Sequence, residues 1–363
     1  MKYELVAGFE THVELSTKTK IFCGCTTQFG GEPNTHCCPI CIGLPGTLPK
    51  LNRQVVKYAI MAGLATNCKI ATVAKMDRKN YTYPDLSKAY QISQYDKPLC
   101  ENGYIQLSNG RKIRILRIHI EEDAGKLIHE RGNTYVDYNR GGVPLIEIVT
   151  EPDFRSVDEA KEYVEKLQQI MRYIGVSDCR MQEGSMRCDV NISVREEGSK
   201  RLGIRTEIKN MNSINNIAKA MEYEFYRQVD LIERGDKVIQ ETLRFDDTTG
   251  TTSPMRGKED ANDYRYFREP DLVTINVTDE KESGVWKIND IYASDAEYNS
   301  TLISNNCNNE YGDELYESKR INKFNKKARK PMKESKEVLF EVDLGYTDNY
   351  QDKDPIAGLS NNE

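Results

Sequence analysis

The sequence lacks the long hydrophobic run that a membrane-spanning helix needs, because no stretch of about 18 consecutive apolar residues occurs in its 363 positions. A secretory leader is not expected either, since the chain begins MKYELVAGFE and reaches Glu4 before any apolar run. Charge of one sign is also missing: 51 Lys and Arg stand against 57 Asp and Glu, a net charge of −6. This balance disfavours a general basic coat for nucleic acid but not a local basic patch. We therefore expect a globular protein of the cytoplasm or of an organelle matrix.

Cysteine is too sparse for a disulfide framework, with ten in the whole chain, yet it is strongly clustered. Five of the ten lie between positions 23 and 41, including one Cys-x-Cys pair and one Cys-x-x-Cys pair with twelve residues between them. Two close thiolate pairs are typical of a tetrahedral zinc site that stabilises structure, and reduced cysteines without metal are the alternative. Cys37 is an additional neighbour and His36 a substitute ligand. The predicted zinc ligands are Cys23, Cys25, Cys38 and Cys41.

The chain divides by composition into two parts. Residues 1–272 contain strand-like segments, capped helices and turns marked by Gly and Pro. Residues 273–363 are rich in Asn, Asp, Glu, Lys and Ser and are only weakly periodic. We expect one domain over the first part, with a zinc loop at residues 22–42, and a solvated or disordered segment over the second.

Strand-like segments outnumber helices in the first part. A helix is predicted at residues 156–175, where Ser156 and Glu159 form a capping box. Two more are predicted at residues 213–235 and, with a less regular pattern, at about 52–64. Strands and helices do not strictly alternate along the chain, so the sequence predicts an α+β fold with a largely antiparallel sheet.

Several strand-like segments place polar side chains on one face, because a strand sends alternate side chains to opposite sides. In LVAGFETHVEL the apolar residues alternate with Glu10, His12 and Glu14. The other in-phase polar residues are Asp189 and Asn191, Glu207 and Lys209, and Glu147 and Glu151, with either Glu121 or Glu122 expected to join them. A sheet with one wet face explains any single strand, but stacked carboxylates repel one another unless cations neutralise them. The pattern therefore predicts a sheet face that binds magnesium and a nucleotide, without the GxxxxGK[ST] motif of P-loop enzymes.

A charged segment at residues 255–272 closes the first part. It carries Arg256, Lys258 and Arg265 among acidic and aromatic residues. Arginine forks of this kind bind nucleotide phosphates, and a solvated charged loop is the alternative interpretation.

Nine motifs spread over residues 3–272 resemble, in order, those of the GatB family, which is the B subunit of the aspartyl/glutamyl-tRNA amidotransferases. They are GFETHVEL, KIFCGC, FGGEPNTHCCPICIGLPGTLP, DRKNYTYPDLSKAYQISQYD, RIHIEEDAGKL, VDYNRGGVPLIEIVTEPD, MQEGSMRCDVNISV, EIKNMNS and DYRYFREPDL. The resemblance implies a catalytic cradle of the glutamine synthetase/guanidino kinase type, in which an antiparallel sheet carries carboxylate-bound magnesium.

The resemblance also implies an activity, that of a ligase which forms a carbon–nitrogen bond with glutamine as amido donor. Members of the family use ATP and Mg²⁺ to phosphorylate the side-chain carboxylate of Glu on tRNA(Gln) or of Asp on tRNA(Asn). Ammonia released from glutamine by the partner amidase then displaces the phosphate to give Gln-tRNA(Gln) or Asn-tRNA(Asn). The amidase and a small third protein complete the heterotrimer.

The family motifs imply roles for individual residues. Positions that bind metal or lie on the ammonia path are Glu10, His12, Glu121, Glu122 and Glu207, and the magnesium ligands among them are Glu10, His12, Glu122 and Glu207. Strand phase adds Lys209 as a further catalytic candidate. The candidates for binding the nucleotide are Glu147, Asp189, Asn191, Arg256, Lys258 and Arg265. The four cysteines named above match the zinc motif of the family position for position.

The sequence departs from the family in two respects. Residues 273–363 do not resemble the helical and tail domains with which family members bind tRNA. Ala89 stands where the family usually has glycine, Thr11 where it has valine and Arg268 where it has proline. These departures leave two alternatives to an active enzyme. One is a catalytically idle, truncated protein that only docks the amidase, and the other is an ATP-dependent ligase for a small free carboxylate.

Overall fold

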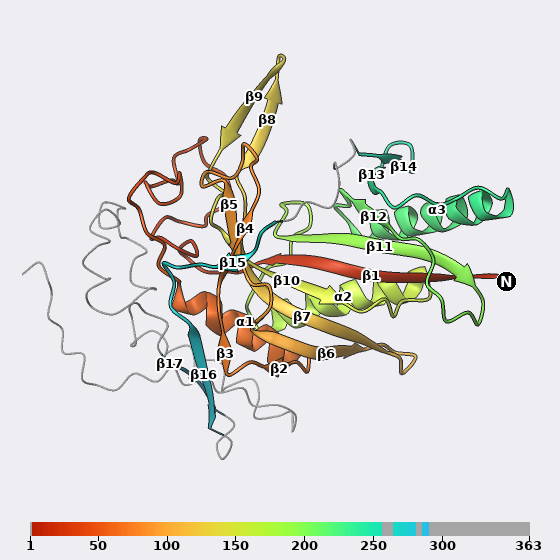
Figure 1. The fold of residues 1–363 in the computed structure, drawn as a ribbon, viewed down its shortest axis with the longest axis horizontal. Helices are drawn as coiled ribbons and strands as arrows, with labels where there is room; N and C mark the ends of the chain where they lie inside the picture. Colours follow the sequence, from red (N-terminus) through yellow and green to blue (C-terminus); the bar gives the residue numbers. More distant parts are fainter. Residues whose placement is uncertain (1, 256–263, 281–284, 290–363) are drawn as a thin grey trace, which may run out of the picture.

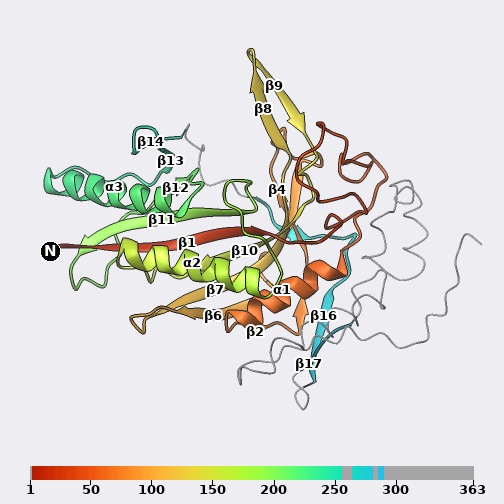
Figure 2. The same cartoon turned by 180° about the vertical axis from the view of Figure 1, so that it is seen from behind.

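A nine-stranded sheet forms the centre of the molecule (Figures 1 and 2). The computed structural model describes residues 2–255, 264–280 and 285–289. Neighbouring strands of the sheet are antiparallel except for the parallel pair β12 and β13. In spatial order the strands are β14 (Thr251–Pro254), β13 (Thr242–Asp246), β12 (Thr206–Lys209), β11 (Met186–Glu196), β1 (Tyr3–Glu14), β10 (Pro144–Thr150), β7 (Lys112–Glu122), β6 (Cys100–Gln106) and β2 (Lys69–Ile70). The prediction of an α+β fold with a mostly antiparallel sheet is confirmed.

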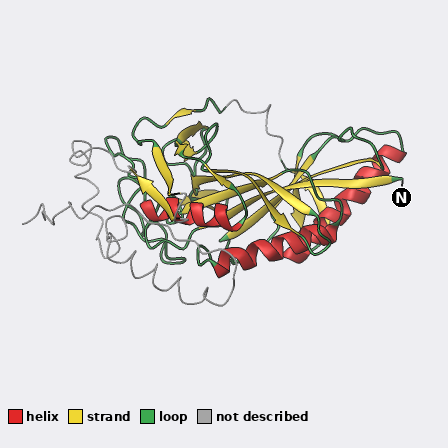
Figure 3. Cartoon of the chain, turned by 90° about the horizontal axis from the view of Figure 1, so that it is seen from below, coloured by secondary structure: helices red, strands yellow, loops and turns green. Residues whose placement is uncertain are grey.

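Three helices pack along one side of this sheet (Figure 3). They are α1 (Arg53–Ala65), α2 (Val157–Tyr173) and α3 (Ile214–Glu233), close to the predicted ranges. Ser156 accepts a hydrogen bond from the backbone N–H of Glu159 and so caps α2, as the capping box predicts. Within the part of the chain that the structure describes, no helix is long and apolar enough to cross a bilayer.

The central strand β1 separates the core from a polar face. Its odd-numbered residues Leu5, Ala7, Phe9 and Val13 are buried. The Phe9 ring lies 5.8 Å from the ring of Tyr163 on α2, centroid to centroid, so the odd face is the one that the helices cover. Because side chains alternate along a strand, Glu10 and His12 point to the opposite face, away from the helical layer.

Three smaller sheets surround the large one. The strands β15 (Phe267–Arg268), β4 (Asp77–Asn80) and β5 (Tyr90–Ser93) form one sheet, and β17 (Val285–Asn289), β16 (Ile275–Glu280) and β3 (Val73–Ala74) form another. The hairpin of β8 (Lys126–Glu130) and β9 (Asn133–Asp137) projects from the body (Figure 1).

The described fold continues beyond residue 272, where composition placed the end of the domain. β16 pairs with β3, and Ile275 and Val277 are buried in the main core. Composition does not reveal this strand, because its two buried residues stand among polar neighbours. Most of the predicted polar segment, residues 290–363, lies outside the described residues.

Ala89 occupies a backbone conformation that suits glycine. Its φ of 61° lies in the left-handed region, where a Cβ atom is unfavourable. We expect Ala89→Gly to raise the free energy of unfolding by about 0.5–1 kcal/mol, the relief of strain exceeding the greater entropy of glycine in the unfolded chain. Chemical denaturation measures the change. As a control, Ala218→Gly inside α3 should lower the same quantity by about 1 kcal/mol. A less stable Ala89→Gly protein would contradict the expectation.

Candidate functional site

The strand register gathers the predicted polar residues on the face of the sheet opposite the helices, which we call the polar face. Across β1 and β10, His12 lies opposite Glu147, and across β10 and β7 Glu147 lies opposite His119. Across β1 and β11, Glu10 lies opposite Asp189. Directly opposite residues of antiparallel strands share a face, so in-phase positions of separate strands become neighbours.

The first group on this face is His12, Glu121 and Glu147, which we call the His12 cluster. His12 Nε2 lies 3.2 Å from Glu121 Oε1 and 3.7 Å from Glu147 Oε2. One potential ligand atom from each of the three residues lies within 4.8 Å of the others. Two carboxylates and one imidazole, held this close, are a donor set suited to a divalent cation such as Mg²⁺ or Mn²⁺.

The electrostatics of the His12 cluster favour a positive charge at its centre. Burial opposes protonation of His12, but the hydrogen bond and charge of Glu121, together with the charge of Glu147, raise the His12 pKa to about 9. Burial likewise opposes ionisation of Glu147, yet His119 and His12 hold the pKa of this carboxyl well below its usual range. His119 Nε2 lies 3.0 Å from Glu147 Oε2. The positively charged imidazolium of His12 thus neutralises the same two carboxylates that a bound cation would neutralise.

The His12 cluster predicts a pH-dependent affinity for divalent cations. His12 must lose its proton to bind a metal, and with a pKa of about 9 it carries that proton at neutral pH. We expect the Kd for Mn²⁺ to fall about tenfold for each pH unit between 7 and 9. In the metal-free protein, protonated His12 contributes stability below pH 6.5 that is lost as pH rises through 9. Titration of Mn²⁺ followed by electron paramagnetic resonance measures the affinity, and a Kd independent of pH in this range would contradict it.

A second polar group lies on the neighbouring strands β1, β11 and β12. Lys209 Nζ lies 2.6 Å from Asp189 Oδ2 and 2.7 Å from Glu207 Oε1, which together raise the pKa of Lys209 although burial opposes it. Asn191 donates to Glu10 Oε1 at 3.0 Å. Burial, and next the charge of Glu147, raise the pKa of Glu10. The structure therefore brings together five of the predicted residues: Glu10, Asp189, Asn191, Glu207 and Lys209.

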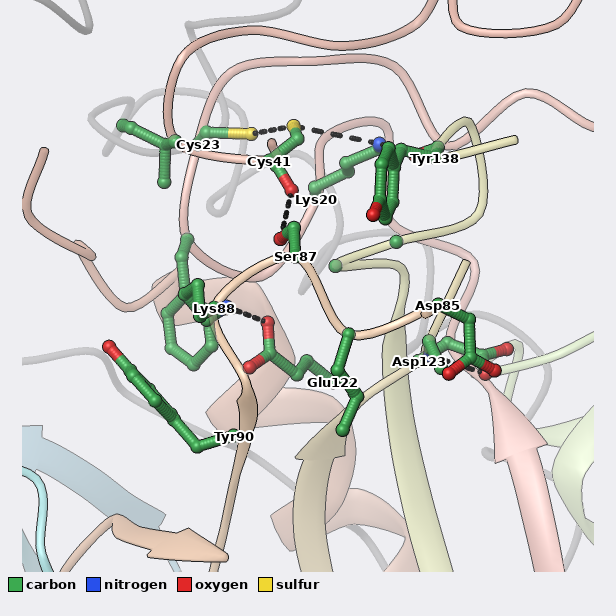
Figure 4. A pocket seen from close by; sticks show the side chains of 16 residues that line it. Lys20, Cys23, Cys41, Asp85, Ser87, Lys88, Tyr90, Glu122, Asp123 and Tyr138 are labelled. Carbon is green, nitrogen blue, oxygen red and sulfur yellow. Dashed lines mark hydrogen bonds and ion pairs between the residues drawn. The ribbon is translucent and has the colours of Figure 1, made fainter. Parts of the chain in front are cut away.

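Of the adjacent pair at the end of β7, Glu121 joins the polar face and Glu122 does not. Glu122 accepts hydrogen bonds from Lys88 Nζ at 2.6 Å and from the backbone N–H of Ile92 at 2.8 Å. Figure 4 shows the contact between Lys88 and Glu122, and near it the hydrogen bond that Ser87 Oγ donates to Cys41 O at 2.7 Å. Glu122, expected among the magnesium ligands, therefore lies apart from the His12 cluster.

The remaining predicted positions fall in the segment 255–272. Arg256 and Lys258 lie outside the described residues. Arg265 is exposed and adopts a positive φ of 44°, and its carbonyl accepts a hydrogen bond from Asn80 Nδ2 at 2.8 Å. Sequence reasoning missed His119 as a member of the site, although the alternation that selects Glu121 in RIHIEE selects His119 as well.

The four predicted zinc ligands form a compact group of thiols, which we call the cysteine cluster. Their sulfur atoms lie within 4.8 Å of one another. Cys41 Sγ is 3.3 Å from Cys23 Sγ and 3.8 Å from Cys38 Sγ, too far for disulfides. Tetrahedral zinc with Zn–S bonds of about 2.3 Å separates its sulfur ligands by about 3.8 Å. The geometry is thus compatible with the predicted zinc site.

A buried lysine accompanies the cysteine cluster. Lys20 is fully buried, and its ammonium donates to Cys41 Sγ at 3.6 Å and to the carbonyl of Tyr138 at 3.2 Å (Figure 4). Burial opposes the charge of Lys20, but the neighbouring cysteines raise its pKa. Hydrogen bonds from Cys23 and Cys25 lower the Cys41 pKa to about 7, so this sulfur is readily a thiolate.

These observations define a class of protein: an α+β domain whose antiparallel sheet carries a carboxylate–histidine site on one face and a four-cysteine cluster in a loop. The family described as the GatB/GatE catalytic domain matches residues 5–282. The chain belongs to this family.

Curated relatives of the chain are named as the B subunit of aspartyl/glutamyl-tRNA(Asn/Gln) amidotransferase. The protein of Caldicellulosiruptor saccharolyticus is 63% identical over 284 residues, 77% of this chain and 59% of the relative. That of Thermoanaerobacter sp. X514 is 61% identical over 291 residues, 79% of this chain and 61% of the relative. That of Clostridium novyi is 59% identical over 283 residues, 77% of this chain and 60% of the relative. The chain thus spans about 60% of the length of these relatives.

Proposed function

We propose that this chain activates a carboxylate for amide formation on tRNA. It uses ATP and Mg²⁺ to phosphorylate the side-chain carboxylate of Glu attached to tRNA(Gln), or of Asp attached to tRNA(Asn), and the activated group is then amidated. The observation that carries the proposal is the His12 cluster on the polar face of a GatB/GatE catalytic domain. The mostly antiparallel sheet supports a fold of the glutamine synthetase/guanidino kinase type.

The chemistry consists of two displacements. An oxygen of the substrate carboxylate attacks the γ-phosphorus of ATP, and ADP leaves. Ammonia then attacks the acyl carbon, loses a proton, and phosphate leaves with the oxygen of the former carboxylate. Activation is needed because an unmodified carboxylate has no adequate leaving group. The protein contributes mainly by positioning the reactants and by neutralising charge on the transferring phosphoryl group.

The described side chains fit these tasks. His12, Glu121 and Glu147 would hold Mg²⁺, which when bound neutralises charge on the phosphates. His119 orients Glu147 through their 3.0 Å contact. Glu122 is left out of this ligand set, because Lys88 and Ile92 already occupy its carboxylate oxygens.

The second polar group would serve the nucleotide and the reacting groups. Lys209, held between Asp189 and Glu207, places a positive charge on the polar face next to Glu10 and Asn191. Negatively charged phosphates need such a cation as well as the metal. Arg265, Arg256 and Lys258 remain candidates for further phosphate contacts.

The proposed partners follow from the same assignment. They are the amidase of the complex, which supplies ammonia from glutamine, the small third protein of the heterotrimer and the mischarged tRNA. The names of the relatives, which denote one subunit of a tRNA amidotransferase, support a complex of several subunits that acts on tRNA. A catalytically idle docking protein is not favoured, because the described residues of the His12 cluster and of the second polar group are both brought together on the sheet face.

Conversion of Glu-tRNA(Gln) to Gln-tRNA(Gln) tests the proposal directly. The purified chain is supplied with ATP, MgCl₂ and ammonium chloride in place of the amidase, beside the relative from Caldicellulosiruptor saccharolyticus as control. We expect product that depends on ATP. A chain that forms no product and consumes no ATP beside a working control would refute the proposed activity.

A further inference from the structure

Four tyrosine rings gather in one group beside the polar face, which we call the tyrosine cluster: Tyr81, Tyr95, Tyr264 and Tyr266. The rings of Tyr95 and Tyr266 are stacked, 4.2 Å apart between centroids and 7° from parallel. The edge-on contacts, Tyr81 with Tyr264 and Tyr264 with Tyr266, have centroid distances of 5.7 Å and 6.0 Å. Stacked and edge-on rings together make a continuous aromatic surface.

The tyrosine cluster is assembled from two segments far apart in sequence, and a buried ion pair holds them together. Arg78 on β4 donates to both carboxylate oxygens of Glu269, at 2.6 Å and 2.8 Å, and Glu269 is fully buried. The backbone N–H of Asn80 donates to the carbonyl of Tyr264 at 2.9 Å. A bidentate Arg–carboxylate pair has a defined geometry, so the rings are held in place.

Burial of apolar surface in the core does not explain why Tyr95 lies stacked on Tyr266. Tyr95 is 56% exposed although Tyr266 covers one face of its ring. The accessible part of Tyr95 is therefore largely the opposite face and edge, a flat aromatic surface open to solvent. Base–aromatic stacking uses such surfaces in proteins that bind nucleotides and single-stranded nucleic acid.

The tyrosine cluster adjoins cationic side chains and the His12 cluster. Lys79 Nζ lies 4.7 Å from the Tyr264 ring centroid. Ser93, two residues before Tyr95, donates through Oγ to Glu121 Oε2 at 3.5 Å, which places the start of this segment against the His12 cluster. Burial, and then the charges of Glu121 and Glu147, raise the pKa of Tyr266. Arg117, in phase with His119 and Glu121 on β7, has a buried Nε without a hydrogen-bond partner among the described residues. An aromatic surface, cations able to contact phosphate and the His12 cluster thus lie side by side.

We propose that the Tyr95–Tyr266 pair binds an adenine base by stacking on the exposed face of Tyr95. This inference rests on the proposed function, which brings two adenosines to the site: that of ATP, and the terminal adenosine of the tRNA. The amino acid to be activated is esterified to the terminal adenosine, so that base must lie close to the reacting carboxylate. The shared chemistry is a purine ring joined to an anionic group that enters the polar face.

Leucine substitutions test the stack. We expect Tyr95→Leu and Tyr266→Leu each to weaken binding of one adenosine ligand about tenfold or more, whereas Tyr95→Phe and Tyr266→Phe keep the aromatic ring and the affinity. Tyr83→Leu is the matched control, since Tyr83 is equally exposed at 54% but is not among the stacked rings. Thermal unfolding checks that all variants are folded.

Two direct binding measurements identify the source of the adenosine. Equilibrium dialysis gives the Kd for ATP–Mg²⁺, and filter binding gives the Kd for tRNA(Gln) with and without its terminal adenosine. If the leucine variants lose affinity for ATP–Mg²⁺ and keep their affinity for tRNA, the tyrosine stack binds the base of the nucleotide. If instead they bind intact tRNA no more tightly than tRNA without its terminal adenosine, the stack binds the end of the tRNA.

Unchanged affinity for both ligands in folded leucine variants would overturn the inference, as would wild-type protein that binds neither ligand. Failure of the proposed function is seen separately. In that case the wild-type chain forms no Gln-tRNA(Gln) in the ammonia assay, whereas the binding measurements still report whether the tyrosines stack on adenine.

Discussion

Glu121→Gln is expected to lower the rate of the proposed ATP-dependent carboxylate activation at least about a hundredfold, because it removes one of the three ligands, and one of the two negative charges, that would hold the metal. Glutamine has nearly the same shape as glutamate, so the buried site at the end of β7 can accommodate it. Glu121 Oε1 lies 3.2 Å from His12 Nε2. The substitution should therefore also lower the elevated pKa of His12, which Glu147 alone would then support, and weaken Mn²⁺ binding at least about tenfold.

Glu4→Gln provides the matched control for this variant. Glu4 lies on β1 in phase with His12 and forms ion pairs with Arg195 and Arg155, at 2.8 Å and 3.6 Å. His12 is eight positions further along the strand, a distance of roughly 26 Å. Its loss should leave the rate unchanged. A Glu121→Gln protein with activity and Mn²⁺ affinity close to those of the wild type would refute the assignment of the metal site.

Cys41→Ser is expected to abolish binding of the proposed zinc and to lower Tm by roughly 10 °C, which corresponds to several kcal/mol for a domain of this size. Cys41 is the centre of the cysteine cluster, with Cys23, Cys38 and Lys20 all within hydrogen-bond range of its sulfur. Without the metal and the Cys41 sulfur, Cys23, Cys38 and the buried Lys20 ammonium lose the group that all three contact. Zinc content by elemental analysis and Tm by calorimetry measure the two effects.

Cys37→Ser is the control for the zinc prediction. Cys37 adjoins Cys38 in sequence but is not one of the four clustered thiols, and its Sγ contacts Asn139 Oδ1 at 3.7 Å. Burial raises its pKa to about 11, so it is a poor thiolate donor at neutral pH. This variant should retain about one zinc per chain. Wild-type protein free of zinc, or a Cys41→Ser protein of undiminished stability, would contradict a structural zinc site.

Local geometry explains why much of the polar face could be predicted from sequence. Alternation along β1 is a property of any extended strand, so Glu10 and His12 must share a face whatever the rest of the fold does. Asp189 with Asn191, and Glu207 with Lys209, follow in the same way. The spacing of the four cysteines is likewise local, since a short loop limits how far two thiol pairs can separate.

The sequence analysis left the choice between Glu121 and Glu122 open. Alternation puts Glu121 in phase with His119 and Glu122 in phase with Ile118 and Ile120, but it does not show what either carboxylate contacts. The pairing of β7 with β10 places His119 opposite Glu147 and thereby brings Glu121 to the polar face. Glu122 instead meets Lys88, a residue from another segment of the chain.

The sequence by itself determined the fold class, the three helices, the polar face and the cysteine cluster, because period and spacing are encoded among near neighbours. Only the tertiary structure decided the membership of the His12 cluster, the burial of Lys20 beside Cys41 and the stacking of Tyr95 on Tyr266. Each of these joins residues from separate segments, and Tyr95 and Tyr266 meet only because β15 pairs with β4. Such contacts depend on strand register and loop path, which no local pattern specifies.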